Sequence, residues 1–373
     1  MKKRSLIFYI SRFSGHYYAA KAIENSLISL DRGIETRMMN AFAYTNPVLG
    51  KIIDKMYLGV IKNKPNLWGN IYDNPDVLKK IIKARKLFHR YNMPKIDRLM
   101  RSYAPDIVYC TQAYPCGIVA DYKKKYGSNV RLVGVLTDHA PHSYWLFDEV
   151  DFYVVPSEET AEVFKQKGAA PEKIKVFGIP VDGSFRLKHD RESSRKKYVL
   201  SIDKPVILVM GGTQGLGVME QTVDLLMNDK VHGYQLLVVT GKNKGLYRRL
   251  QRKTKYFHRG ALNIFSYTEN IGELMDIADV VITKAGGMTT AEALTKELPL
   301  IITSPIPGQE RMNASYLLRE GAAVEVVDVE DTLNVVNRLF DSEGLLKKMK
   351  ENAGRLAMPD SASKIAALAL EGV

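Results

Sequence analysis

The stretch TKAGGMTTAEAL, residues 283–294, has the residue types of a nucleotide site and follows an apolar run of the chain. One interpretation is a strand that turns into a helix, with Thr289 and Glu292 forming a capping box whose hydroxyl and carboxylate bind backbone N–H groups. The other is a nucleotide site, in which Gly286 and Gly287 open a helix start for a diphosphate and Glu292 binds the ribose hydroxyls. Taken alone, the motif favours the capping box.

Three further crossings from an apolar run into a helical pattern carry polar or glycine-rich residues. They are VILVMGGTQGLG at 206–217, VTGKN at 239–243 and PIPGQERMNA at 305–314. The glycine spacing of the first crossing does not match the dinucleotide fingerprint G-x-G-x-x-G read from Gly212, and no Lys-Ser/Thr closes a P-loop. The NAD and NTPase interpretations are therefore weakened.

Side chains that follow parallel strands gather at the carboxyl edge of a sheet, where ligands of open α/β sheets bind. An amide and a carboxylate held together, as in Gln309 and Glu310, suit the several hydroxyls of a sugar. The four crossings together therefore predict a nucleotide-sugar site. The predicted substrate-binding residues are Gly212, Thr213, Gly241, Lys242, Tyr267, Gly286, Gly287, Thr289, Glu292, Gly308, Gln309, Glu310 and Asn313.

Two segments of the first half hold candidate catalytic side chains. SGHYYAA, 14–20, sets His16 just after the first apolar run, where an imidazole could take a proton from an acceptor hydroxyl. TDHAPHSYW, 137–145, adds Asp138, His139 and His142. A metal cluster is disfavoured because the H-E-x-x-H spacing is missing, and no D-x-D pair for metal-bound diphosphate occurs. We predict no metal and no cofactor.

Apolar, β-branched runs alternate with helical patterns in two series, which is typical of buried parallel sheets. The expected strands of the first series are 4–10, 34–40, 106–110, 130–136, 152–157 and 173–180. Those of the second are 205–211, 234–240, 262–267, 279–283, 299–303 and 323–329. The sequence therefore predicts an α/β protein with two doubly wound Rossmann-like domains facing across a cleft, residues 1–180 and 181–358. A C-terminal helix, 359–373, is expected to pack back toward the N-terminal domain.

Composition excludes several other classes of protein. With 46% hydrophobic and 25% charged residues, the chain has the composition of a globular protein. No apolar run approaches the roughly 20 residues of a membrane span, and the start MKKRSLIFYISRF lacks the pattern of a signal peptide. Two cysteines, Cys110 and Cys116, are too few for a disulfide framework or a thiolate metal site. We expect a reduced, cytoplasmic protein.

Positive charge is concentrated in residues 51–103, which hold thirteen Lys or Arg and four Asp. Apolar residues at helical spacing and the aromatic residues Tyr57, Trp68, Tyr72 and Tyr91 lie among these charges. This mixture favours an anionic membrane surface over nucleic acid as the partner. The alternative, helices packed on their own domain with solvated lysines outside, stays open.

Six motifs together resemble those of the monogalactosyldiacylglycerol synthase and processive diacylglycerol glucosyltransferase family. They are SGHYYAA, TDHAPHSYW, GIPVD, VTGKN, TKAGGMTTAEA and PIPGQERMNA, and they extend over nearly the whole chain. The resemblance implies the two-domain GT-B fold, with the acceptor bound by the N-terminal half and a UDP-sugar by the C-terminal half. It also implies metal-independent, inverting transfer to a lipid hydroxyl.

The resemblance also implies roles for individual residues. Gly212, Thr213 and Gly241 would line the nucleotide pocket, and Gly286, Gly287 and Thr289 would contact the diphosphate. Glu292 would bind the ribose, Gln309 and Glu310 the sugar, and His16 would be the base, with Asp138 in reserve. The approach to the histidine departs from the glycine-rich pattern of the family, because Arg12-Phe13-Ser14-Gly15 has one glycine.

The expected function is transfer of glucose or galactose from a UDP-sugar to diacylglycerol, by a peripheral enzyme on the cytoplasmic face of the membrane. Three alternatives remain: a polyprenyl-linked sugar as acceptor, a UDP-sugar epimerase, and a sensor that binds UDP-sugar and a partner protein. The basic insertion disfavours a soluble epimerase, and the base candidates His16 and Asp138 disfavour a sensor. No nucleic-acid partner is expected.

Overall fold

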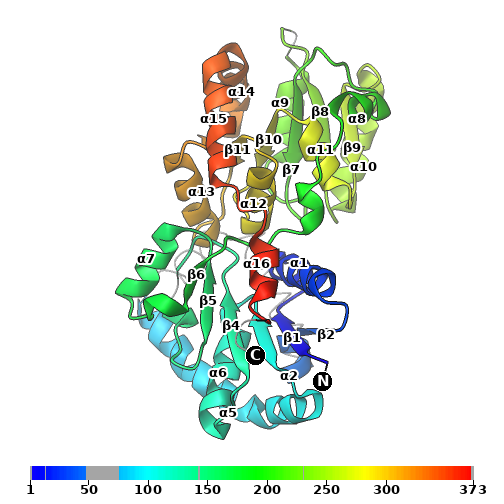
Figure 1. Ribbon diagram of the computed structural model, residues 1–373. Helices are drawn as coiled ribbons and strands as arrows, with labels where there is room; N and C mark the ends of the chain where they lie inside the picture. Colours follow the sequence, from blue (N-terminus) through cyan, green and yellow to red (C-terminus); the bar gives the residue numbers. More distant parts are fainter. Residues whose placement is uncertain (1, 13, 48–74, 142, 230, 371–373) are drawn as a thin grey trace. The chain divides into compact units, whose positions relative to one another are not determined.

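The computed structural model describes residues 2–12, 14–47, 75–141, 143–229 and 231–370, and gives the backbone only for residues 75–87, 143 and 343 (Figure 1). The chain divides into two compact units. The first comprises Met1–Gly183, Pro307–Gln309 and Asp360–Val373, and the second Ser184–Ile306 and Glu310–Pro359. The sequence placed these boundaries at 180/181 and 358/359, and the short inclusion of 307–309 was not foreseen.

The first unit is built on a six-stranded parallel sheet. Its strands are β1 (Arg4–Tyr9), β2 (Glu35–Asn40), β3 (Ile107–Cys110), β4 (Arg131–Val135), β5 (Phe152–Val155) and β6 (Ile174–Val176), in the order β2-β1-β3-β4-β5-β6. Its main helices are α1 (Gly15–Leu30), α2 (Ala41–Thr45), α5 (Pro75–Tyr103), α6 (Ala113–Tyr126) and α7 (Glu158–Gln166). Order reverses between β1 and β3, so a crevice is expected at their carboxyl ends.

The second unit has its own six-stranded parallel sheet. Its strands are β7 (Val206–Met210), β8 (Gln235–Val239), β9 (Leu262–Phe265), β10 (Val280–Thr283), β11 (Leu300–Thr303) and β12 (Ala323–Val326), in the order β12-β11-β10-β7-β8-β9. The helices are α8 (Arg191–Lys197), α9 (Met219–Met227), α10 (Lys244–Lys253), α11 (Ile271–Ile277), α12 (Gly287–Thr295), α13 (Gln309–Arg319), α14 (Thr332–Asp341) and α15 (Glu343–Leu356). Renumbered within the unit, this is the Rossmann order, with its reversal between β7 and β10. The predicted pair of doubly wound parallel sheets is confirmed.

The last helix, α16 (Ser361–Ala367), belongs to the first unit and packs against α1. The Tyr109 hydroxyl donates to the Ile365 carbonyl at 3.1 Å, and the Ser361 hydroxyl donates to the Gly178 carbonyl at 2.8 Å. Ile365 itself is fully buried with Ile23 of α1. The end of the chain therefore completes the core of the N-terminal unit.

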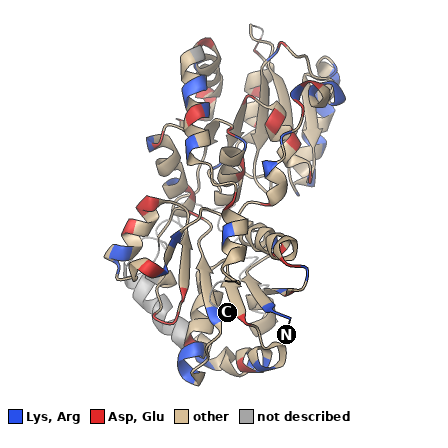
Figure 2. Cartoon of the chain, in the orientation of Figure 1, with Lys and Arg blue, Asp and Glu red and all other residues tan. Residues whose placement is uncertain are grey.

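The basic insertion is described in its second half, where α5 packs on its own unit. Met93, Ile96, Leu99 and Met100 recur at helical spacing and are buried in the core, whereas Tyr91 is 73% exposed. The alternative that these helices serve their own domain thus holds for 88–103. Residues 48–74 and the side chains of 75–87 lie outside the described part. Both signs of charge occur on α1, α7, α8 and α15, whereas α10 carries Lys and Arg without Asp or Glu (Figure 2).

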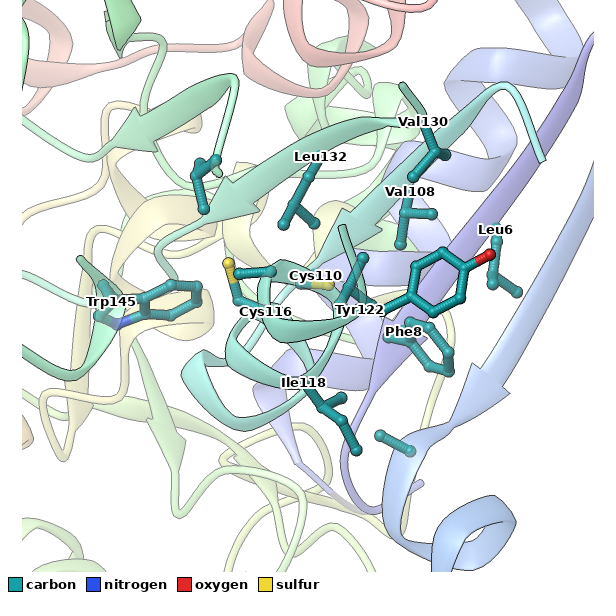
Figure 3. Close-up of a cluster of buried hydrophobic side chains, with 14 of the residues drawn as sticks. Leu6, Phe8, Val108, Cys110, Cys116, Ile118, Tyr122, Val130, Leu132 and Trp145 are labelled. Carbon is teal, nitrogen blue, oxygen red and sulfur yellow. The ribbon is translucent and has the colours of Figure 1, made fainter. Parts of the chain in front are cut away.

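Both cysteines lie in the main apolar cluster of the first unit (Figure 3). Cys110 and Cys116 are free, fully buried and surrounded by residues such as Val108, Leu132 and Trp145. Successive residues of β1 and β3 alternate between this cluster and a second one, so both faces of the sheet are covered by apolar packing. That is why these strands read as continuous apolar runs in the sequence.

Candidate active site

The glycine-rich crossings meet at the carboxyl edge of the second sheet. Gly212 follows β7 and has φ of +66°, a backbone conformation that side-chain-bearing residues rarely adopt. Gly241 follows the neighbouring strand β8 and has φ of +57°. Its missing side chain would lie only 2.5 Å from the Thr213 carbonyl oxygen, and the Lys242 N–H donates to that oxygen at 2.9 Å. The two loops therefore pack backbone to backbone, which requires glycine at 241.

The crossing after β10 does not contain the capping box. Helix α12 begins at Gly287 with Gly286 as N-cap, and no side chain caps it. Thr289 lies within the first turn, and Glu292 is the sixth residue of the helix, too far along to reach the first N–H groups. The capping interpretation is therefore wrong, because the helix starts three residues earlier than the threonine pattern indicated. Glu292 is partly exposed.

The polar side chains after β11 contact different parts of the chain. Asn313 is 1% exposed, and its amide donates to the Ala285 carbonyl at 2.8 Å, which supports the loop before α12. Glu310 forms an ion pair with Lys284 and accepts a hydrogen bond from the Ile306 N–H at 3.1 Å. Gln309, a member of the first unit, donates from Nε2 to Asp138 Oδ2 at 2.9 Å. This hydrogen bond joins Gln309, a predicted sugar-binding residue, to Asp138, a candidate catalytic base.

Of the remaining predicted substrate-binding residues, Lys242 and Tyr267 follow β8 and β9 at the same edge of the second sheet, whereas Gly308 belongs to the first unit. The Lys242 ammonium lies 5.9 Å from the centroid of the Tyr267 ring, within the range of a cation–π contact. Partial burial lowers the pKa of Lys242. Gly308 precedes α13 and has φ of +89°.

His16 lies in the first turn of α1, beside the reversal point of the first sheet. Its Nδ1 is 2.9 Å from the Thr137 hydroxyl, and its backbone carbonyl accepts a hydrogen bond from the Thr111 hydroxyl at 2.9 Å. The residue keeps part of its surface exposed, yet loss of water around the ring lowers the pKa of His16 to about 4. The imidazole is therefore neutral at physiological pH and able to accept a proton.

Asp138 follows Thr137 directly and differs from His16 in its protonation. Burial raises the pKa of the Asp138 carboxyl to about 7, and a hydrogen bond from the Ala140 N–H opposes this rise only in part. Near neutral pH the Asp138 carboxyl is therefore partly protonated and partly ionised, whereas the His16 imidazole is neutral. The two base candidates can be told apart by pH.

The loop before His16 has a single glycine, and a serine takes the backbone conformation that glycine favours. Ser11 takes a positive φ of 43°, a region that glycine favours, and its carbonyl accepts a hydrogen bond from the Ser14 hydroxyl at 2.9 Å. Ser14 then serves as the N-cap residue of α1. The departure from the family pattern therefore does not prevent His16 from lying at the helix start.

Sequence reasoning missed two residues of the first unit and one of the second that lie beside predicted site residues. Thr111 and Thr137 hold His16, and Lys284 lies between the glycine loops of the second unit. Thr111 and Lys284 directly follow a buried strand and Thr137 lies two residues after one, which is the only signal that could have found them. Within the described part of the chain, no three His, Cys, Asp or Glu side chains gather as metal ligands. His142, a member of the disfavoured metal cluster, lies outside that part.

The two halves of the chain match two family models. Residues 16–181 match the monogalactosyldiacylglycerol (MGDG) synthase model, and residues 206–368 match the glycosyltransferase family 28 C-terminal domain. Among solved structures, the MurG of Acinetobacter baumannii has a TM-score of 0.66 at 16% identity, covering 99% of this chain and 100% of that one. An S. aureus MnaA–UDP co-structure has a TM-score of 0.63 at 16% identity, covering 97% and 94%. These likenesses agree with the two-domain GT-B fold.

Curated relatives match nearly the whole chain. The processive diacylglycerol beta-glucosyltransferase of Bacillus pumilus is 31% identical over 97% of this chain and 93% of its own length. The protein of the same name from Bacillus subtilis strain 168 is 30% identical over 97% and 94%. Identity of this size over such coverage shows common descent, so the chain belongs to the glycosyltransferase family of the MGDG synthases and processive diacylglycerol beta-glucosyltransferases.

Proposed function

We propose that this protein transfers a hexose, glucose or galactose, from a UDP-sugar to diacylglycerol and forms a β-linked glycolipid. The observation that carries the donor assignment is the carboxyl edge of the second sheet, where glycine loops and the start of α12 meet at the strand-order reversal. The acceptor assignment draws on the names of the curated relatives. Similar folds have also been solved with UDP and with UDP-glucose.

The proposed reaction is a single displacement with inversion. The acceptor hydroxyl loses its proton to His16, and its oxygen forms a bond to the anomeric carbon of the sugar. The bond from that carbon to the diphosphate oxygen breaks on the opposite face, and its electron pair leaves with UDP. Inversion of the α-linked donor gives the β-linked product.

The tautomer of His16 decides whether it can act as this base. If Nε2 is to accept the proton, Nδ1 must carry a hydrogen and donate it to the Thr137 hydroxyl at 2.9 Å. Thr137 is thus a positioning residue. The pKa of about 4 keeps Nε2 unprotonated through the physiological range.

The leaving diphosphate gains negative charge as the bond breaks, and the proposal assigns its stabilisation to the protein. No side chain caps α12, so its N-terminus offers backbone N–H groups and the positive end of the helix dipole. A side chain on Gly286 would meet no atom closer than 4.0 Å, so a phosphate has room to approach. No metal is needed for this step in the proposal.

The test is product formation from diacylglycerol vesicles with UDP-glucose or UDP-galactose, separated by thin-layer chromatography. We expect a glycolipid with a β-linkage by NMR, formed at the same rate when EDTA is present. An epimerised UDP-sugar without any glycolipid would contradict the proposal. If product formed only from a polyprenyl-linked sugar, the protein would still be a transferase, but diacylglycerol would not be its acceptor.

We further propose that the protein is peripheral on the cytoplasmic face of the membrane, where diacylglycerol can be reached. In the described residues, no helix combines the length and apolar character of a membrane span. The basic residues of 51–103 supply attraction to anionic lipid of about 1 kcal/mol per Lys or Arg near the surface, which salt screens.

Vesicle sedimentation tests this attraction. Binding should rise with anionic lipid content, fall with salt, and weaken when Lys79, Lys80, Lys83, Arg85 and Lys86 are replaced with serine. The physical reason is loss of positive charge, so activity on a short-chain, soluble diacylglycerol should survive the change.

A matched control removes five other cations that lie exposed in the structure. These are Lys347, Lys348, Lys350, Lys364 and Arg252. This variant should bind vesicles as the parent does. If all three proteins bound neutral and anionic vesicles equally, the basic residues of 51–103 would have no role in membrane binding.

A further inference from the structure

Lys284 lies where the strand order of the second sheet reverses. It directly follows β10, whose neighbour β7 pairs with it in parallel, Thr283 beside Met210. The chain leaves β7 through Gly211 and Gly212 and leaves β10 through Lys284, on two loops that separate at this point. Such a reversal is where a crevice for ligands opens in an open α/β sheet.

The side chain of Lys284 reaches both glycine loops. Its Cε is 3.5 Å from the position that a Cβ on Gly212 would occupy, and its Nζ is 4.0 Å from that position on Gly286. Gly286 is also the N-cap residue of the nine-residue helix α12. The ammonium therefore lies beside the places where backbone leaves room for a ligand, and next to a helix N-terminus that attracts anions.

Glu310 holds this ammonium. Its Oε1 forms the ion pair with Lys284, and its Oε2 accepts the Ile306 N–H at 3.1 Å. The Lys284 and Glu310 side chains are only 18% and 14% exposed. A lysine paired in this way is ordered by its partner and also neutralised by it, which matters when a second anion arrives.

We propose that Lys284 binds the terminal phosphate of UDP and stabilises the leaving group, and that Glu310 competes with the phosphate for the same ammonium. The inference rests on the proposed function and deepens it. When the sugar–phosphate bond breaks, the electron pair stays on the diphosphate, and the cation that neutralises the added charge is Lys284. Glu310 is then a positioning residue, in addition to the sugar contact that the family resemblance implies.

Competition predicts effects of opposite sign for the two residues, measured by calorimetric titration with UDP, UMP and uridine. Lys284→Met should weaken UDP binding by about tenfold or more, the size of a charge-assisted hydrogen bond, and leave uridine binding unchanged. Glu310→Gln should strengthen UDP binding, because the amide oxygen can still accept from Lys284 while the competing charge is gone. In the Lys284→Met background, Glu310→Gln can relieve only the repulsion between the carboxylate and the phosphate, so the double variant should bind UDP more weakly than Glu310→Gln alone.

Two further variants complete the design. Lys284→Arg keeps the charge and should retain most of the UDP affinity. Lys244→Met removes a cation from an exposed position at the start of α10, following the same sheet edge, and should behave as the parent does.

The inference is overturned if Lys284→Met binds UDP like Lys244→Met, or if it loses UDP and uridine equally. It is also overturned if Glu310→Gln fails to strengthen UDP binding in the presence of Lys284. A parent protein that binds neither UDP nor uridine would instead contradict the proposed function itself. The two failures are therefore distinguishable.

Discussion

Replacing His16 with alanine is expected to lower turnover by roughly 10²–10⁴-fold, the contribution of a positioned general base. Affinity for UDP should stay unchanged, because the residues proposed to hold UDP belong to the second unit and His16 to the first. Initial rates at saturating donor, together with calorimetric titration of UDP, would measure both quantities. Turnover within a few-fold of the parent would place the base elsewhere.

Two variants of Thr137 act as controls for this assignment. Thr137→Val removes the hydroxyl that orients Nδ1 of His16, so turnover should fall by less than in His16→Ala. Thr137→Ser restores a hydroxyl and should recover most of the rate. A purely structural role for Thr137 would not distinguish these two substitutions in turnover at equal thermal stability.

The pH dependence of kcat/KM separates His16 from Asp138. If His16 is the base, the rate is held above the pKa of about 4 and is lost only as pH falls toward it. If Asp138 is the base, the rate is already halved near pH 7 and falls tenfold per unit below that, because its carboxyl must be ionised. We expect the first profile, with the acid limb unchanged in Asp138→Asn.

The architecture could be predicted because its signal is local. All twelve expected strands are present, because most of them, such as β7 and β8, are buried on both faces and are continuous apolar, β-branched runs. The carboxyl-edge location of Gly212, Gly241 and Gly286 followed from the same alternation. Each of these glycines directly follows a strand or lies within three residues of its end.

The contacts of the site could not be predicted in the same way, because they depend on residues far apart in the chain. His16 is held by Thr111 and Thr137, 95 and 121 residues away, and neither threonine differs in the sequence from an ordinary strand end. The capping box failed for a related reason. The position where α12 begins is set by how the loop leaves β10, which the threonine spacing does not encode. The ion pair of Lys284 with Glu310 likewise joins two crossings that were considered separately.

Glu292→Ala is expected to weaken UDP binding with little loss of thermal stability. The capping interpretation predicted the reverse, a lowered melting temperature with unchanged affinity, but α12 begins at Gly287 and Glu292 lies beyond its first turn. If Glu292 binds both ribose hydroxyls, its removal leaves two hydroxyls without their acceptor, at about 1–3 kcal/mol.

The experiment compares UDP with a 2′,3′-dideoxy analogue in the parent and in Glu292→Ala. The parent should prefer UDP over the analogue, and the variant should bind the two nearly alike, because the lost contact is the one that reads the hydroxyls. Glu351→Ala, which removes an exposed carboxylate from α15, should keep the preference of the parent. If Glu292→Ala retained that preference and melted at a lower temperature, Glu292 would be a residue that stabilises the fold and the ribose contact would have to come from another side chain.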